Sequence, residues 1–138
     1  MKFIFLILTF LIFSGCNGKG SGNQQVDTQT YGLQLNIVAG NNQKAPANSA
    51  YPIKLTVALN NELSTTQGSQ VPIVFSEQTS TGVIFDSHSA GITTIPTDNT
   101  GVAATTVTAP NLNGADIVIR AHVSNAPNVY TDFHLQTN

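Results

Sequence analysis

The chain has 138 residues, of which 9% are charged, with 5 basic against 7 acidic side chains. Without a cluster of Lys and Arg it lacks the basic surface that nucleic-acid binding requires, and a single cysteine excludes an intramolecular disulfide. Thr, Val, Ile and Asn are abundant while helix-forming Leu, Glu, Lys and Ala stretches are scarce, which favours a single all-β domain.

The N-terminal segment combines a positive charge, an apolar run and a cysteine. Lys2 precedes an apolar run of about 11 residues, Phe3 to Phe13, which is shorter than the roughly 18 residues that cross a bilayer. Two small residues, Ser14 and Gly15, come directly before Cys16. The segment therefore resembles the signal peptide of a bacterial lipoprotein, although Phe stands three residues before the cysteine, where that family prefers Leu.

The resemblance implies that residues 1–15 are removed after Gly15 and that Cys16 is acylated. A cysteine thiolate is nucleophilic enough to take a diacylglycerol group, and two or three acyl chains hold a protein durably on a membrane. Loss of Lys2 leaves four basic against seven acidic side chains. An ordinary secretory signal cut near Gly15, leaving a free thiol, is the alternative. Asn17, in place of the Asp that commonly retains Gram-negative lipoproteins in the inner membrane, implies sorting to the outer membrane.

Residues 16–30 are rich in Gly, Ser, Asn and Gln and show no apolar periodicity. We expect the acylated cysteine to be followed here by a flexible tether, which would hold the domain on the order of 20 Å from the membrane.

Residues 31–138 alternate apolar and polar positions, which predicts about seven short antiparallel strands in an immunoglobulin-like two-sheet sandwich. Turn signals at Thr97–Gly101 and Pro110–Gly114 separate strands, and one strand is expected between them at Val102–Ala109. Short strand pieces are expected at Val83–Phe85 and Ile92–Ile95. The positions expected to face the core are Leu33, Leu35, Ile37, Ile53, Leu55, Val57, Leu59, Val71, Ile73, Phe75, Ala103, Thr105, Val107, Ile117, Ile119, Ala121, Val123, Val129, Thr131, Phe133 and Leu135.

Three stretches resemble the bacterial immunoglobulin-like group 1 module, which repeats in the invasin and intimin adhesins. They are the strand Val71–Ser76, the turn and strand Thr97–Ala103, and the strand Gly114–Val123. The resemblance covers about residues 33–136 and implies a sandwich that needs neither a cysteine pair nor a core tryptophan.

The same resemblance implies that the last two strands form an antiparallel hairpin around Ser124–Asn128. Pairing that is symmetric about Ala126 would place Arg120 opposite Asp132 and His122 opposite Tyr130, all on the outward face. Such cross-strand pairs contribute roughly 0.2–1 kcal/mol, and we interpret them as fixing the strand register.

No residue pattern predicts catalysis, a cofactor or a metal. Asp86, Ser87 and His88 are adjacent, so their side chains alternate sides and cannot form a catalytic relay along one strand. His122 and His134 are expected outward on neighbouring strands, without a cysteine or a convergent carboxylate. The stretch Asp98–Gly101 is explained by a tight turn, and the acidic residues are too scattered for a glycosidase pair. We therefore expect a protein without enzymatic activity or a small-molecule substrate.

Binding surfaces are less easily excluded. Tyr31, Tyr51 and Tyr130 do not cluster in the sequence and there is no Trp, which argues against a carbohydrate platform. Val74 and Val118 are expected on solvated faces, either as isolated exposed residues or under a partner. The free edges of the first and last strands offer docking by strand addition.

Our sequence-based hypothesis is a lipid-anchored envelope protein that docks other proteins. It would be a small subunit of an outer-membrane assembly such as a secretion-system core complex, on the periplasmic face rather than the cell surface. The alternative is a surface adhesin of the invasin and intimin type that binds a host or matrix component. Adhesins of that family string many modules together to project, whereas a single module on a short tether projects little. A third alternative is a periplasmic inhibitor or a chaperone-like binder.

Overall fold

The structure is a computed structural model that describes residues 32–62, 68–86 and 88–138, and within these ranges the regular elements are all β-strands. They are β1 (Leu33–Ala39), β2 (Gln43–Ala45), β3 (Leu55–Asn61), β4 (Pro72–Glu77), β5 (Ile84–Phe85), β6 (Ser89–Ala90), β7 (Ile92–Pro96), β8 (Val102–Thr105), β9 (Val107–Thr108), β10 (Asp116–Val123) and β11 (Ala126–Thr137). In the described part of the chain, no helix has the length and hydropathy to cross a membrane. The predicted signal peptide, Gly15, Cys16 and the predicted tether lie outside the described residues.

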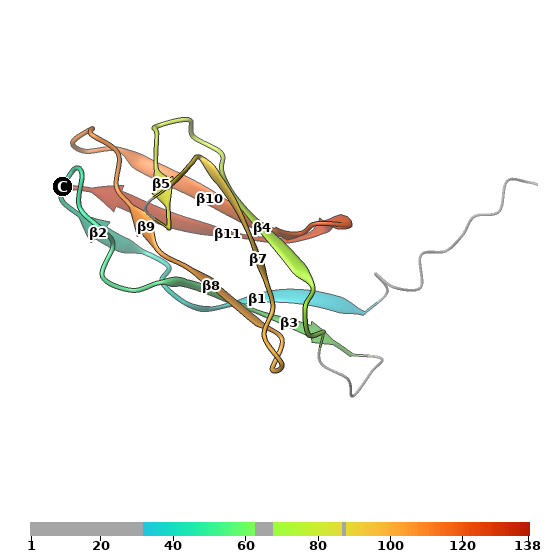
Figure 1. Cartoon of the computed structure of the whole chain (residues 1–138). Coiled ribbons are helices and arrows are strands. Elements are labelled where there is room, and N and C mark those ends of the chain that lie inside the picture. Colours follow the sequence, from blue (N-terminus) through green and yellow to red (C-terminus); the bar gives the residue numbers. More distant parts are fainter. Residues whose placement is uncertain (1–31, 63–67, 87) are drawn as a thin grey trace, which may run out of the picture.

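The strands form three hydrogen-bonded sheets. The largest has the order β2-β11-β10-β4-β7, the second β1-β3-β8 and the smallest β6-β5-β9. Only Thr106 separates β8 from β9, so the two smaller sheets continue into one another, and Figure 1 shows β1, β3 and β8 on one side of the molecule with β10 and β11 on the other. Every pair is antiparallel except β2 with β11, so the predicted all-β antiparallel sandwich is confirmed.

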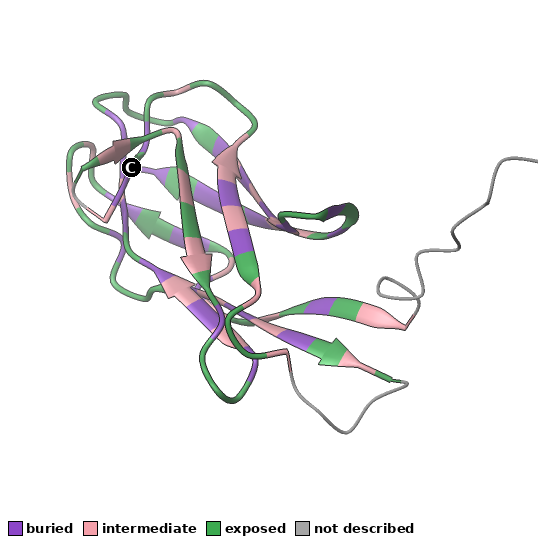
Figure 2. Cartoon of the chain, turned by 45° about the vertical axis from the view of Figure 1, so that its right-hand side comes forward, coloured by how far each residue is buried: buried purple, intermediate pink, exposed green. Residues whose placement is uncertain are grey.

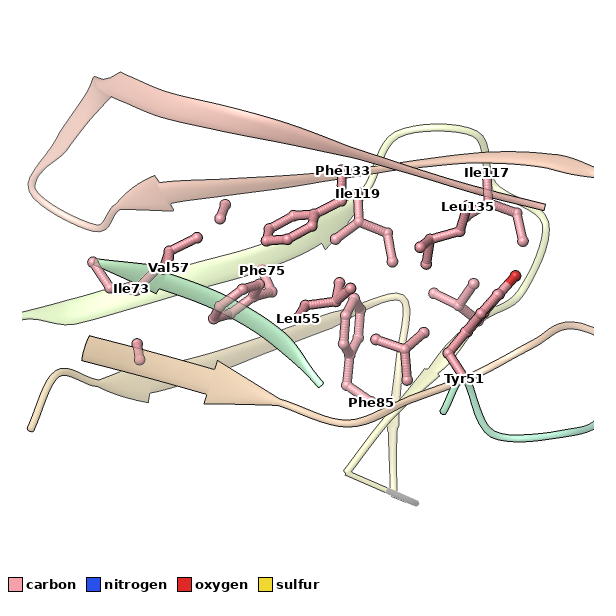
Figure 3. Close-up of a cluster of buried hydrophobic side chains, with 14 of the residues drawn as sticks. Tyr51, Leu55, Val57, Ile73, Phe75, Phe85, Ile117, Ile119, Phe133 and Leu135 are labelled. Atoms are coloured by element: carbon pink, nitrogen blue, oxygen red, sulfur yellow. The ribbon is translucent and has the colours of Figure 1, made fainter. Parts of the chain in front are cut away.

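The core lies between the sheets and is made by every second residue of the long strands (Figure 2). Phe75 and Phe133 approach to 6.4 Å between ring centroids, and Phe85 and Leu55 pack in the same cluster (Figure 3). Burying each such side chain contributes roughly 1.5–3 kcal/mol. Most of the positions expected to face the core are buried; Leu33, Ile37, Val71 and Thr131 are half-buried at its margins.

The prediction that Ile53 faces the core is wrong, because its side chain is 53% exposed and β3 begins only at Leu55. The cause is Gln43, a buried residue whose side chain holds the backbone of Ile53. Gln43 Oε1 accepts a hydrogen bond from Ile53 N at 2.8 Å, and Gln43 Nε2 donates to Ile53 O at 2.7 Å and to Gly40 O at 2.7 Å. The backbone groups of Ile53 are therefore satisfied outside the sheet.

Gly40 is where the N-terminal segment changes sheets. Before it, β1 pairs with β3; after it, β2 pairs in parallel with the end of β11. The φ of Gly40 is +91°, and a Cβ on this residue would lie 2.4 Å from Lys54 O, so only glycine fits. The strand β2 was not predicted, because three residues without apolar alternation give no strand pattern.

The stretch Val102–Ala109 was expected to be one strand but divides at Thr106. Its first half pairs with β3 and its second half with β5. The Asp86 carboxylate holds the break by accepting hydrogen bonds from Thr106 N at 3.1 Å and Thr106 Oγ1 at 3.3 Å. The predicted inward positions Ala103, Thr105 and Val107 are nevertheless all buried, since the strand direction is kept across the break.

The register of the last hairpin is confirmed: Arg120 pairs with Asp132 and His122 with Tyr130. The turn is shorter than expected. Val123 pairs with Ala126, so Ser124 and Asn125 alone make the turn, and a bulge next to His122 absorbs the extra residues.

Candidate functional site

The outer face of the five-stranded sheet carries the most distinctive exposed chemistry of the domain. We call this surface the β10–β11 face and define it by Lys44, Val74, Asp116, Val118, Arg120, His122, Tyr130, Asp132, His134 and Gln136. These side chains point away from the core because they alternate with the buried residues of β2, β4, β10 and β11.

Arg120, Asp132 and Tyr130 form the ordered centre of this face. Arg120 donates from Nε to Asp132 Oδ1 and from Nη2 to Asp132 Oδ2, both at 2.8 Å. The guanidinium also lies 3.9 Å from the centroid of the Tyr130 ring, a cation–π contact. This is the one ion pair formed between residues that the structure describes.

The electrostatics of the pair follow from this geometry. The hydrogen bonds from Arg120 lower the pKa of Asp132, against the opposing effect of partial burial. In return, the Asp132 carboxylate raises the pKa of Arg120, so both groups stay charged over the physiological range. A bidentate pair fixes the guanidinium plane, and the plane in turn orients the phenol. The result is a rigid Tyr–Arg surface in which the tyrosine side chain remains 49% exposed.

The histidines do not converge on a site. His122 lies opposite Tyr130 and His134 opposite Val118, which places the two imidazoles four strand positions apart, about 13 Å along the sheet. Among residues 32–62, 68–86 and 88–138, no three His, Cys, Asp or Glu side chains are grouped so that they could hold a metal ion.

His88 lies in an exposed loop, where its Nδ1 is 2.8 Å from Asp86 O. The Asp86 carboxylate bonds Thr106 instead, so Asp86 and His88 are not arranged as members of a relay. Ser87 lies outside the described residues. Asp98, the other polar loop considered from the sequence, caps its own turn by accepting from Thr100 N at 2.8 Å and Val102 N at 3.0 Å.

The tyrosines have separate roles. Tyr51 is buried, and its hydroxyl donates a hydrogen bond of 3.1 Å to Gln136 O; burial raises the pKa of Tyr51 to about 12. Tyr31 lies outside the described residues. In the part of the chain that the structure describes, Tyr130 is thus the one exposed tyrosine.

Two shallow depressions border this face. One, of about 490 Å³, lies where β2 meets β11 and includes Lys44, Asp116, Val118, His134 and Gln136. Gln136 Nε2 donates to Asp116 Oδ1 at 2.6 Å within it. The other, of about 410 Å³, lies between β1 and the start of β11. Sequence reasoning missed Lys44 and Gln136 because their proximity depends on the unpredicted strand β2.

Val74 and Val118 are half-buried on the β10–β11 face, beside His122 and His134 respectively. They give the face apolar area between its polar groups. A mixture of aromatic, Arg and apolar side chains on the face of a sheet suits recognition of a protein surface.

Comparison with known proteins gives a relationship at the level of the fold. No protein-family model matches the sequence, and no curated protein sequence matches it. Among solved structures, the chain is similar to the adhesin InvE of Yersinia pseudotuberculosis, with a TM-score of 0.61 and 20% sequence identity over 77% of this chain and 32% of that one. The chain thus spans about a third of the length of that adhesin and shares an immunoglobulin-like fold with it.

Proposed function

We propose that this chain is a non-enzymatic, lipid-anchored recognition module of the bacterial cell envelope, which acts as an adhesin-type domain and binds a protein through the β10–β11 face. The ordered group of Arg120, Tyr130 and Asp132 is the observation that carries the proposal. The likeness of the chain's fold to that of an adhesin supports the adhesin alternative over the assembly subunit that we preferred from the sequence.

The chemistry of the face favours tight contact with a protein. Tyr and Arg are the side chains that most often dominate the binding energy of interfaces. Ordering a flexible side chain on binding costs about 0.5–1.5 kcal/mol, and Arg120 is already held by Asp132 before a partner arrives. The neighbouring Val74 and Val118 would be covered in the complex, which accounts for apolar residues on an outward face.

The position of the N-terminal end of the domain determines how a chain anchored at Cys16 would present the β10–β11 face. β1 starts at the end of the sandwich where Leu33 pairs with Asn61, and β11 ends at the opposite end, where Asn138 N donates to Ala45 O at 3.0 Å. Figure 1 shows the two ends of the described domain far apart. An anchor at Cys16 would thus hold the domain by one end and present the β10–β11 face sideways.

The binding proposal is tested with bacteria that produce the full chain, Tyr130→Ala, Arg120→Ala or Asn60→Ala. Adherence is measured to cultured epithelial cells and to immobilised collagen, laminin and fibronectin. We expect about a tenfold or greater loss of adherence for the first two variants, in line with interface hot spots. Asn60, exposed on the opposite sheet, is the matched control and should leave adherence unchanged. Equal adherence of all four at equal surface amounts would contradict the proposal.

Anchoring and the assembly alternative are tested together by a detergent pull-down from native membranes with a C-terminal tag, beside Cys16→Ala. The variant should leave the membrane fraction if Cys16 is acylated. Removal of the tag by protease added to intact cells would support the adhesin. A stoichiometric set of envelope proteins, diminished in the variant, with a protected tag, would instead support the assembly subunit.

A further inference from the structure

β2 builds a wall at one end of the β10–β11 face, and its position is fixed by backbone contacts. His134 N donates to Asn41 Oδ1 and Asn42 N donates to His134 O, both at 2.8 Å. Gln43 is buried, and its side chain is bonded to the backbone of Ile53. The depression of about 490 Å³ beside this wall is therefore formed in the absence of a partner, and its volume lies within the roughly 300–1,000 Å³ of ligand pockets.

The strand pairing places a cation and an anion at opposite sides of this depression. Lys44 pairs with Gln136 and Gln136 with Asp116, so these three exposed residues form one row across β2, β11 and β10. β2 and the end of β11 lie side by side next to the C-terminus (Figure 1). Neighbouring strands are about 4.8 Å apart, which separates the Cα atoms of Lys44 and Asp116 by about 10 Å. At this separation salt screens the two charges from one another to a large extent.

Lys44 differs from the other charged residues of the face in having no partner. Arg120 and Asp132 bind each other, and Asp116 Oδ1 accepts a hydrogen bond from Gln136 Nε2 at 2.6 Å. The Lys44 ammonium group forms neither an ion pair nor a hydrogen bond with any residue in the described ranges. The depression therefore contains a cation that is open to an external anion.

The neighbours of Lys44 suit a carboxylate at the end of a short methylene chain. The side chains of Asn42 and His134 line the same depression and supply N–H donors. Val118 lies opposite His134 and is half-buried, which offers apolar contact to methylene groups. Hydrogen bonds to an ionised carboxylate are stronger than those between neutral groups, so a carboxylate gains more from these donors than an amide does.

We propose that this depression is a subsite of the β10–β11 face that receives a glutamate or aspartate side chain of the partner protein, with the carboxylate on Lys44. The inference rests on the proposed function of the face and adds the chemistry of the partner. His134 follows Asp132 by two residues on the same side of β11, about 7 Å along the strand, so the subsite adjoins the ordered group around Arg120. Asp116 repels a second carboxylate and so restricts the acidic group to the Lys44 side.

The test is an NMR titration of the full acylated chain in a non-ionic detergent with two N-acetylated, C-amidated tripeptides, Ala-Glu-Ala and its neutral counterpart Ala-Gln-Ala. We expect the glutamyl peptide to shift the backbone amides of Lys44, Val118 and His134 in a saturable manner, with a Kd on the order of millimolar. The glutaminyl peptide should leave these amides in place.

Three variants of the chain complete the titration. Lys44→Gln should weaken binding of the glutamyl peptide about three- to fivefold, near the upper end of what a solvent-accessible ion pair contributes. Lys54→Gln removes an exposed lysine outside the depression and is the matched control, which should leave binding unchanged. Lys44→Glu should reverse the preference, so that the tripeptide Ala-Lys-Ala binds in place of the glutamyl peptide.

Three outcomes of the titration would overturn the proposal. They are the absence of saturable shifts at these amides, equal shifts with the glutamyl and glutaminyl peptides, and an equal loss of binding in Lys44→Gln and Lys54→Gln. The last would show general attraction to positive charge in place of a subsite.

Adherence of bacteria that produce Lys44→Glu, Lys54→Gln or Tyr130→Ala separates this inference from the proposed function on which it rests. Loss of adherence in Lys44→Glu and Tyr130→Ala, but not in Lys54→Gln, would support both. Loss in Tyr130→Ala alone would overturn the acidic subsite and leave the proposed function intact. Unchanged adherence in all three would overturn the proposed function, and with it the assignment of the subsite to a partner protein.

Discussion

Arg120 lies directly opposite Asp132 across the β10–β11 hairpin, and the two side chains share a pair of 2.8 Å hydrogen bonds while the guanidinium stacks on Tyr130. The hairpin register therefore does more than align the two strands. It also orders the side chains at the centre of the candidate binding face.

Asp132→Asn should loosen this group with little loss of stability, because solvent-accessible ion pairs contribute little to unfolding free energy. The lowered pKa of Asp132 means that its contribution is present above the ordinary carboxyl pKa and is lost as pH falls through the folded-state pKa. The variant should therefore show a shallower loss of stability below about pH 4. Denaturant unfolding from pH 2 to 7 measures this. Arg120→Lys keeps the positive charge but cannot form the bidentate hydrogen bonds. Its loss of stability at low pH should therefore be intermediate between those of the unmodified protein and Asp132→Asn. Identical acid profiles for all three proteins would contradict the expectation.

Gly40→Ala should destabilise the domain by more than about 3 kcal/mol, because strain at a positive φ adds to a clash with Lys54 O. Gly114→Ala is the matched control: its φ is +68°, but nothing lies within 4 Å of the added Cβ. This control should cost only about 1–2 kcal/mol. Urea unfolding of both variants separates the clash from the backbone strain, and equal losses would show that the Gly40 neighbourhood can move aside.

Glu77→Gln should loosen the loop that follows β4. The Glu77 carboxylate accepts from Thr81 N, from Thr81 Oγ1 at 2.6 Å, from Gly82 N at 3.1 Å and from Val83 N at 3.2 Å. Burial alone would raise the pKa of Glu77, but these hydrogen bonds outweigh it and lower the pKa. Its contribution is therefore present above pH 4.5, the ordinary value, and is lost as pH falls below it.

At neutral pH we expect this substitution to cost about 1–2 kcal/mol and to speed amide exchange at Gly82 and Val83. Thr79→Ala, which removes one 3.2 Å hydrogen bond to the same carboxylate and a 3.4 Å hydrogen bond from Val118 N, is the milder comparison. Unchanged exchange in Glu77→Gln would mean that the loop is held by other contacts.

Tyr51→Phe should make the domain less sensitive to alkali. Burial raises the pKa of Tyr51 from 10.0 to about 12, so the stability linked to its protonated form is complete below pH 10 and declines as pH rises toward 12. The phenylalanine variant lacks this decline, although it loses the hydrogen bond to Gln136 O and starts slightly less stable. Unfolding curves between pH 8 and 11.5 test this, and parallel curves for the two proteins would contradict it.

The sequence by itself determined the inner faces of the long strands, because alternation places Ile117, Ile119 and Phe133 inward. The pairing of Arg120 with Asp132 was implied by the resemblance to the immunoglobulin-like module, and the structure reaches it through a two-residue turn and a bulge next to His122. The comparison with a solved adhesin structure extends this to the fold.

Only the tertiary structure decided where the N-terminal segment changes sheets, and with it the composition of the candidate face. Gln43 reaches the backbone of Ile53, and Gly40 packs against Lys54, contacts between residues ten or more positions apart that no local pattern encodes. Lys44 joins Gln136 and Asp116 for the same reason. Alternation tells which side chains share one strand face, but which strands become neighbours depends on long-range packing.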